Sequence, residues 1–397
     1  MSNLLPRRIE LSVQEDLQTK MVFVAGPRQC GKTTLAERLL DRLGGAYFNW
    51  DDASHRRALR ERALPEEAPL WVFDELHKMR AWRGWLKGVV DLDRKRHQKL
   101  VMGSARLDAY GRGGDSLQGR YLMTRMHPFT LSEFCGVPAL SPDEVIEFPL
   151  QAPRAADEHL DALLRLGGFP EPLLSSSERQ AGRWRLAYGT RLVREEIREL
   201  EALQDLDKVE LLFDRIPSLV GSQLSLNALR EDLEVAFATV ASWMTILEKL
   251  YAVFRVAPFG TPRIKAVKKT AKAYCWDWAR VEDPGARFEN LVMFHLLRFV
   301  HYLEDVHGEK AELRYVRDVV GHEVDALVLR KGRPWLAVEI KLDDRPLAPG
   351  LVYLLKRVAV PYAVQVSLRG SVHRRLEPVG KTQIRAMPAA TFLTHLP

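Results

Sequence analysis

Two glycines, a lysine and two threonines are packed into one short stretch, GPRQCGKTT, at residues 26–34. The stretch matches the pattern G-x-x-x-x-G-K-[ST], in which glycines let the backbone aim its N–H groups at phosphate oxygens. The lysine of this pattern reaches the β- and γ-phosphates, and the following hydroxyl holds Mg²⁺. The sequence therefore predicts a site for ATP and Mg²⁺ built from Gly26, Pro27, Arg28, Gln29, Cys30, Gly31, Lys32, Thr33 and Thr34.

Two adjacent acids follow the apolar letters of APLWVFDEL, residues 68–76. A carboxylate at a strand end can hold the metal, and its neighbour can activate the water that attacks a γ-phosphate. We therefore assign Asp74, together with Thr33, to the metal and Glu75 to the water. The same acids could also begin the helix predicted by LHKMRAWRGWL, and the two roles are compatible.

These residues need strands that end at one edge of a sheet. Short apolar segments alternate with helical patterns along the first part of the chain, which predicts a parallel sheet with right-handed crossovers. The five predicted strands lie in residues 21–25, 46–52, 68–76, 99–104 and 120–126.

Composition limits the class of protein. At 397 residues with 46% hydrophobic letters, the chain can form two or three domains. Its apolar runs are too short to cross a bilayer, its N-terminus lacks a secretory signal, and three widely spaced cysteines form neither a disulfide framework nor a metal pair. We expect a cytoplasmic protein with no membrane partner.

The net charge of +7 permits a polyanionic partner, but 52 acidic residues offset 59 basic ones. One local exception is RIKAVKKTAK, residues 263–272, which carries five basic and no acidic side chains. Such a run is either a solvated surface or a contact to DNA phosphates.

Four prolines between residues 138 and 153 mark a domain boundary. Residues 207–260 then show three helical patterns followed by strand letters, the order of a winged helix-turn-helix. The third helical pattern contains one base, Lys249, and one acid, Glu248, so DNA and a protein partner both remain open for this segment.

A second constellation lies in GHEVDALVLRKGRPWLAVEIKLDD, residues 321–344. A turn centred on Gly332 would place Asp325 across from Glu339, with Lys341 on the same face of its strand. Two carboxylates and a lysine on one face suit metal-dependent cleavage of a phosphodiester.

The stretches GPRQCGKTT, LWVFDELHKMRAW, VMGSARL and SLQGRYLMTRMHPFTLSEF together resemble prokaryotic AAA-type ATPases whose C-terminal half is the domain known as DUF4143. The resemblance covers the whole chain and implies that residues 26–34 are Walker A and that Asp74 and Glu75 are Walker B. It places Ser104 at the sensor position after the fourth strand. It also implies that Arg120 reaches a neighbour's γ-phosphate in a homo-oligomer; an intrachain ion pair is the alternative for Arg120.

The spacing D-x13-E-x-K resembles the PD-(D/E)xK nucleases, which adds Glu289 on a preceding helix to Asp325, Glu339 and Lys341. Gln365 would lie on the next strand. The chain departs from this family at Val324, where the family has proline. An active nuclease, a degenerate fold used for binding, and no such fold all remain open, and His322 is either a ligand or a surface histidine.

The predicted fold class is α/β, with an AAA-type P-loop NTPase parallel sheet, a helical and winged-helix segment, and an α/β restriction-endonuclease-like C-terminal domain. The predicted domains span 1–150 (ATPase), 151–205 (helical linker or lid), 206–262 (winged helix) and 263–397 (nuclease-like). We expect an ATP-binding and ATP-hydrolysing protein that acts on DNA or is regulated by it. The alternative is an ATP-dependent switch that binds a protein partner and has no nuclease activity.

Overall fold

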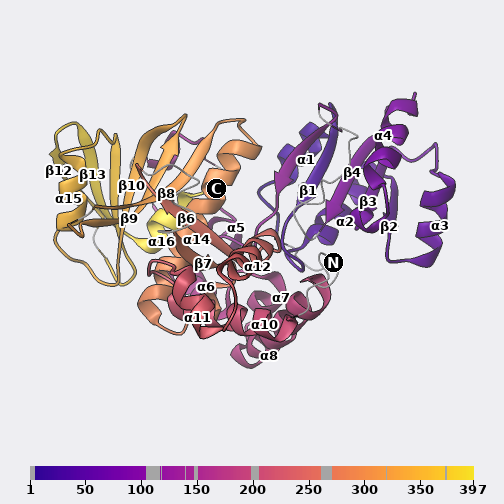
Figure 1. The fold of residues 1–397 in the computed structure, drawn as a ribbon. Helices are drawn as coiled ribbons and strands as arrows, with labels where there is room; N and C mark the ends of the chain where they lie inside the picture. Colours follow the sequence, from indigo (N-terminus) through magenta and orange to yellow (C-terminus); the bar gives the residue numbers. More distant parts are fainter. Residues whose placement is uncertain are drawn as a thin grey trace. The chain divides into compact units, whose positions relative to one another are not determined.

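The computed structural model describes residues 5–103, 117, 119–138, 140–146, 151–197, 205–260, 271–318, 320–371 and 373–397. The chain divides into two compact units, Met1–Pro128 and Phe129–Pro397 (Figure 1). The first unit thus ends before the boundary predicted at residue 150, and the division into four domains stays a prediction.

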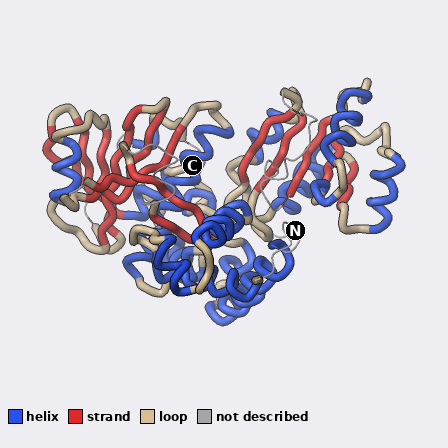
Figure 2. The backbone as a smooth tube through the Cα atoms, viewed as in Figure 1, coloured by secondary structure: helices blue, strands red, loops and turns tan. Residues whose placement is uncertain are grey.

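Five parallel strands form the sheet of the first unit, in the order β2-β3-β4-β1-β5. Figure 2 draws the strands in red and the helices in blue. Each overlaps the segment predicted for it. The strands β1 and β3 are buried on both faces and therefore read as continuous apolar runs. The strands are β1 (Met21–Ala25), β2 (Ala46–Asn49), β3 (Leu70–Asp74), β4 (Gln98–Gly103) and β5 (Tyr121–Arg125).

Helices cover both faces of this sheet. Alternate residues of β1 point to opposite faces, so Val22 and Val24 belong to one apolar cluster and Phe23 to the other. The first cluster takes in Val13 and Leu39 from α1 and α2, and the second takes in residues of α3 and α4. The helices are α1 (Glu10–Asp16), α2 (Lys32–Leu43), α3 (Ala53–Glu61) and α4 (Trp82–Leu92), with the 3₁₀ turn η1 (Leu76–Lys78) after β3.

The second unit contains a mixed sheet in the order β12-β13-β11-β10-β9-β8-β6-β7. Helix α15 packs Leu351 and Leu354 on the face of this sheet that carries Leu327 and Ala337. The strands are β6 (Val253–Pro258), β7 (Lys272–Cys275), β8 (Ala311–Arg317), β9 (Glu323–Arg330), β10 (Arg333–Lys341), β11 (Tyr362–Ser367), β12 (Arg374–Val379) and β13 (Thr382–Pro388).

Helices make up the rest of the second unit. The longest described helix, α14, runs from Pro284 to Asp305 and begins with the side chain of Asp283 accepting a hydrogen bond from the N–H of Ala286. The others are α5 (Leu131–Phe134), α6 (Ala156–Leu166), α7 (Pro170–Leu174), α8 (Glu178–Arg191), α10 (Leu206–Arg215), α11 (Leu226–Asp232), α12 (Phe237–Lys249), α15 (Pro349–Leu355) and α16 (Ala389–His395).

The segment predicted as a winged helix contains α10, α11 and α12, followed by the antiparallel hairpin of β6 and β7. A single antiparallel bridge joins Gln223, between α10 and α11, to Lys272 in β7. Strand β6 also pairs in parallel with β8. The hairpin is therefore the edge of the C-terminal sheet and continues it.

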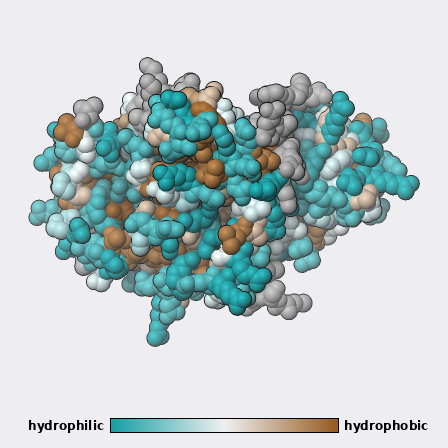
Figure 3. Space-filling model, turned by 60° about the horizontal axis from the view of Figure 1, so that its bottom comes forward, coloured by the Kyte–Doolittle hydropathy of each residue, from teal (hydrophilic) through white to brown (hydrophobic). Residues whose placement is uncertain are grey.

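The predicted fold class is confirmed in its main features: a parallel α/β sheet, a helical region and a C-terminal α/β sheet. The winged-helix and nuclease-like assignments stay predictions. None of the helices in the described ranges is long and apolar enough to cross a membrane. The face in Figure 3 is mainly hydrophilic, with hydrophobic residues in small patches.

Candidate functional site

The loop predicted to cradle phosphates lies between β1 and α2. A side chain at Gly26 would put its Cβ atom 2.2 Å from the carbonyl oxygen of Met126, so only glycine fits there. Gly31 has φ of +100° and starts α2, a conformation that glycine adopts without strain. No side chain caps this helix start. Its first N–H groups therefore remain available to an anion.

Lys32 is folded onto this loop. Its ammonium donates to the carbonyl of Gly26 at 3.0 Å and to that of Pro27 at 2.8 Å, and the residue is 7% exposed. Among the described residues it forms no ion pair. A buried cation held only by neutral carbonyls is suited to an anionic ligand, which would supply the missing charge.

Asp74 ends β3 and is bound by a residue that the sequence did not single out. The hydroxyl of Tyr47, in the neighbouring strand β2, donates to Oδ2 of Asp74 at 2.6 Å. Burial raises the pKa of Asp74, and burial together with Asp74 raises the pKa of Tyr47. A hydrogen bond between Thr33 and Tyr47 acts in the opposite direction on the pKa of Tyr47. One phenol thus connects Thr33 and Asp74, the two predicted metal ligands.

Glu75 leaves the strand in a left-handed conformation, with φ of +54°, and starts η1. Its Oε2 lies 3.5 Å from Nε2 of His77 and 3.6 Å from Nζ of Lys78. Burial, then the charges of Lys78 and Lys32, lower the pKa of His77 to about 4. His77 is therefore neutral at pH 7 and was not identified from the sequence.

Arg120 forms the intrachain ion pair that the sequence left open as an alternative. Its Nε lies 3.0 Å from Oδ1 of Asp91, and both side chains are more than a third exposed. Ser104, the predicted sensor, lies outside the described residues.

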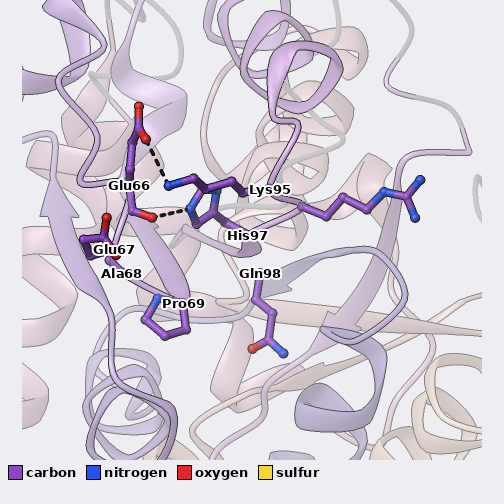
Figure 4. A pocket seen from close by; sticks show the side chains of 8 residues that line it. Glu66, Glu67, Ala68, Pro69, Lys95, His97 and Gln98 are labelled. Atoms are coloured by element: carbon purple, nitrogen blue, oxygen red, sulfur yellow. Dashed lines mark hydrogen bonds and ion pairs between the residues drawn. The ribbon is translucent and has the colours of Figure 1, made fainter.

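A polar cavity of about 330 Å³ lies at the opposite edge of the sheet from the phosphate loop, before β3 and β4 begin (Figure 4). The Glu66 carboxylate pairs with Lys95 at 3.0 Å, and Nε2 of His97 lies 3.0 Å from the Glu66 carbonyl. This cavity is therefore separate from the candidate nucleotide site. Its lining residues are Glu66, Glu67, Ala68, Pro69, Lys95, Arg96, His97 and Gln98.

The C-terminal acids meet where the strand pairing was predicted to bring them. In β9 and β10, Val328 pairs with Leu336 and Ala326 with Val338, and the same register places Asp325 across from Glu339. The N–H of Ile340 donates to Oδ2 of Asp325 at 2.8 Å.

Lys341 bonds Oε1 of Glu339 at 2.5 Å, whereas Oε2 of Glu339 is buried without a hydrogen-bond partner. Burial, then the charges of Glu339 and Glu289, raise the pKa of Asp325. Burial also raises the pKa of Glu339. The two carboxyl groups are thus protonated more readily than ordinary ones.

Glu289 is occupied by two residues of β7. Lys272 lies 3.3 Å from Oε1 of Glu289, and the hydroxyl of Tyr274 donates to the same oxygen at 2.8 Å. Lys272 also pairs with Glu323 at 2.5 Å and is 2% exposed. The basic run 263–272 was interpreted as a solvated surface or a phosphate contact. For Lys272 that interpretation is wrong, because strand pairing turns it inward; residues 263–270 lie outside the described ranges.

Gln365 and His322 are engaged elsewhere. The Gln365 side chain donates to the Arg345 carbonyl at 2.8 Å and accepts from the N–H of Ala348 at 2.9 Å, which orders the segment before α15. His322 bonds Asp318 at 2.9 Å and stacks on Tyr353, with ring centroids 3.8 Å apart.

A metal ion does not fit the C-terminal acids as they are arranged. Within the described ranges, no three His, Cys, Asp or Glu side chains are placed to hold a metal. Lys272 and Lys341 already hold carboxylate oxygens of Glu289, Glu323 and Glu339. Magnesium and calcium need about six or more oxygen ligands, so a metal ion would have to compete with these lysines for the carboxylates.

Comparison with known families agrees with the first unit's geometry. An AAA domain model matches residues 18–135, which contain the phosphate loop and Asp74. Models for two domains of unknown function match residues 157–280 (DUF8612) and 284–386 (DUF4143). The AAA domain model thus matches the part of the chain that contains the five-stranded parallel sheet, and the DUF4143 model matches the C-terminal part.

Similar whole proteins include the uncharacterized protein Rv2008c of Mycobacterium tuberculosis, 23% identical over 94% of this chain and 81% of that protein. The uncharacterized protein MJ1637 of Methanocaldococcus jannaschii is 22% identical over 75% of this chain and 72% of that protein.

Among solved structures, the RuvB Holliday junction branch migration motor of Thermotoga maritima aligns with TM-score 0.30 and 16% identity, over 64% of this chain and 90% of that one. A STAND protein with a tetratricopeptide repeat sensor from Pyrococcus horikoshii aligns with TM-score 0.23 and 14% identity, over 78% and 48% of the two chains. Scores this low carry no statement about function.

Proposed function

We propose that this chain binds and hydrolyses ATP through its AAA domain. The loop of residues 26–34 and Lys32 hold the triphosphate, and Thr33 and Asp74 hold Mg²⁺. Glu75 accepts the proton of the water that attacks the γ-phosphate, while the bond from the γ-phosphorus to the bridging oxygen breaks and ADP leaves. Bound Mg²⁺ would neutralise charge on the phosphate oxygens.

The main support for this proposal is that Lys32 is buried with an uncompensated positive charge among the described residues. Its ammonium is 7% exposed, it has only carbonyl partners within the described residues, and it stands at an uncapped helix start. Gly26 leaves room against Met126 for the backbone alone. This arrangement supports an anionic ligand of the size of a phosphate.

The site is consistent with Mg²⁺ as well. Asp74 and Thr33 contact the same hydroxyl of Tyr47, so an oxygen ligand from each is close to the phosphate loop. Glu75 follows the end of β3 in a left-handed conformation, so its side chain does not occupy the place of the Asp74 carboxylate as a metal ligand.

Two variants test the proposal. Lys32→Ala should abolish ATP binding in calorimetry, because the ammonium of Lys32 is the main positive charge that the proposed site offers to the phosphates. Glu75→Gln should bind ATP as the parent does and lose about 10²–10⁴-fold in turnover, the usual contribution of a general base. Lys20→Ala, at an exposed residue, is the matched control and should change neither.

Parent-like hydrolysis by Glu75→Gln would show that another group activates the water. Unchanged nucleotide binding by Lys32→Ala would remove the proposed phosphate site altogether.

The second part of the function is the choice between DNA and a protein partner. The exposed residues of α12 include Phe237, Ala238, Ser242 and Thr245, and none of them is basic. Helices that enter a major groove usually carry basic side chains. We therefore favour the switch that binds a protein partner, and a DNA-directed role, a homo-oligomer and a cytoplasmic location stay predictions.

Fluorescence anisotropy with a labelled DNA duplex distinguishes the two roles. The protein-partner role predicts weak binding that α12 substitutions leave unchanged. Tight binding that weakens steeply with salt and is lost in Ser242→Glu would instead establish DNA as the ligand of α12.

A further inference from the structure

The acid cluster of the second unit contains four carboxylates and a lysine that comes from outside the predicted site. Glu289 belongs to α14, Glu323 and Asp325 to β9, and Glu339 to β10. Lys272 belongs to β7, the outer strand of the hairpin that follows α12. Acids from two separate elements, α14 and β9, therefore meet at the ammonium of Lys272.

The contacts of Lys272 are those of a bound cation. Its Nζ lies 2.5 Å from Oε1 of Glu323 and 3.3 Å from Oε1 of Glu289, and it sits 5.4 Å from the ring centroid of Tyr315. The side chain is 2% exposed. Two carboxylates from different elements and one aromatic face enclose a single positive charge.

The charge balance shows why a cation is needed there. Glu289 and Glu323 both approach Lys272 in a partly buried position, and holding two carboxylate charges there without a cation is unfavourable. Lys341 balances Glu339 at 2.5 Å, and Arg317 shares Glu323 at 2.7 Å. Burial lowers the pKa of Lys272, but Glu289 and Glu323 outweigh burial and raise it. The ammonium consequently stays charged inside the protein.

We infer that the ammonium of Lys272 takes the place of a divalent cation at this acid cluster, so that the domain closes the cluster with an internal ion pair and binds no metal there. A divalent ion would have to displace Lys272 from Glu289 and Glu323 or sit beside its positive charge. Because Lys272 lies in β7, the same ion pair ties the hairpin that follows α12 to α14 and β9. This inference is independent of the proposed ATP site.

The test measures Mn²⁺ binding to the full chain by electron paramagnetic resonance, without nucleotide and in an Asp74→Asn background that removes the carboxylate of the two proposed N-terminal metal ligands. With Lys272 in place, the cluster should leave added Mn²⁺ free and the thermal midpoint unchanged by Mn²⁺. Lys272→Met should gain one bound Mn²⁺ per chain and a midpoint that rises with Mn²⁺ concentration.

The matched control is Lys331→Met, which removes an equally charged side chain that is 76% exposed and paired with Glu309. It should behave like the chain with Lys272. If Lys272→Met does not fold, the charge-matched variant Lys272→Met with Glu323→Gln leaves Glu289, Asp325 and Glu339 for the ion and should show the same gain.

Two results would overturn the inference. One is stoichiometric Mn²⁺ binding with Lys272 present that disappears in Asp325→Asn, because the cluster would then be a metal site as it stands. The other is a folded variant without Lys272 that still binds no Mn²⁺, because the position of Lys272 would then have no affinity for a cation.

Discussion

Lys32 in the first unit and Lys272 in the second are both buried beside acids, at 7% and 2% exposure, but they are held by opposite kinds of group. Lys32 donates to two backbone carbonyls, whereas Lys272 pairs with two carboxylates. Carbonyls leave the charge of an ammonium uncompensated, and carboxylates neutralise it. The charge of Lys32 is therefore left for an anionic ligand to neutralise, whereas the charge of Lys272 is already neutralised by carboxylates of the protein.

The comparison also shows that a pattern of residue types does not distinguish a site that is ready for a ligand from one that is neutralised. Both sites combine a lysine with nearby acids. The two sites differ in the groups that hold the lysine, which are carbonyls for Lys32 and carboxylates for Lys272. These groups decide whether the lysine can still attract an anionic ligand.

The largest effect should come from removing each lysine in turn and measuring stability by urea denaturation. Lys272→Met should destabilise the second unit by about 1.5–3 kcal/mol, because it removes charge-assisted bonds from the partly buried carboxylates of Glu289 and Glu323. Lys32→Met should cost about 1 kcal/mol, because only hydrogen bonds to carbonyls are lost. The control Lys331→Met should stay within about 0.5 kcal/mol of the parent. Equal losses for the two buried lysines would erase the distinction drawn between them.

The next effect concerns the hydroxyl that joins the two proposed metal ligands. Tyr47→Phe removes a hydrogen bond to Asp74, and such bonds to charged groups contribute about 1.5–3 kcal/mol. We expect the Mg²⁺ concentration for half-maximal ATP hydrolysis to rise by about tenfold or more, with ATP binding in calorimetry nearly unchanged. Tyr121→Phe is the matched control, since its ring stacks on Phe23 with centroids 4.3 Å apart. An unchanged Mg²⁺ requirement would mean that Tyr47 does not position these ligands.

The third test uses pH, for which the two regions have opposite signs. The pKa of His77 in the folded protein is about 4, below its ordinary value of 6.5. Its contribution to the free energy of unfolding is therefore fully present above pH 6.5 and is lost as the pH falls toward 4. The folded pKa of Asp325 is raised, so its contribution is present at low pH and is lost as pH rises from about 4 through the raised pKa. Each effect is at most about 1.4 kcal/mol per pH unit.

Thermal midpoints of His77→Gln and Asp325→Asn, followed from pH 4 to pH 9 beside the parent, measure these slopes. His77→Gln should lose less stability than the parent on the acid side, and Asp325→Asn should lose less on the alkaline side. Slopes of the same sign for both variants would contradict the assignment of charge states.

The smallest effect should come from Arg120. As a partner of Asp91 on the surface, Arg120→Ala should cost about 0–1 kcal/mol of stability and leave ATP turnover unchanged. Asp91→Ala, which breaks the same pair from the other side, should match it. A fall in turnover by about 10³-fold in Arg120→Ala alone would show that Arg120 acts on a neighbour's nucleotide instead.

Much of the first unit could be predicted from the sequence because its signals are local. β1 and β3 are continuous apolar runs, and the glycines and lysine of the phosphate loop are neighbours along the chain. The pairing of Asp325 with Glu339 was also predictable, because the tight turn at Gly332, with φ of +76°, sets the register of two adjacent strands.

The site residues that the sequence did not predict make contacts with residues far away in the chain. Tyr47 and Asp74 are 27 residues apart, and Lys272 and Glu289 are 17 apart, in each case with no pattern that connects them. Lys272 also stood in a run of basic letters, which favoured a surface position. Its antiparallel pairing with β6 and its bridge to Gln223 turned it toward the acids instead.

The amino-acid sequence by itself determined the position of the glycine loop at which we propose that phosphate binds, because backbone geometry at glycine and the start of a helix depend on a few consecutive residues. Only the tertiary structure decided which charges are already paired. A salt bridge forms between side chains that folding brings within a few ångströms, whatever their separation in the chain, and so the fate of Lys32 and that of Lys272 could be told apart only after the strands had been assembled.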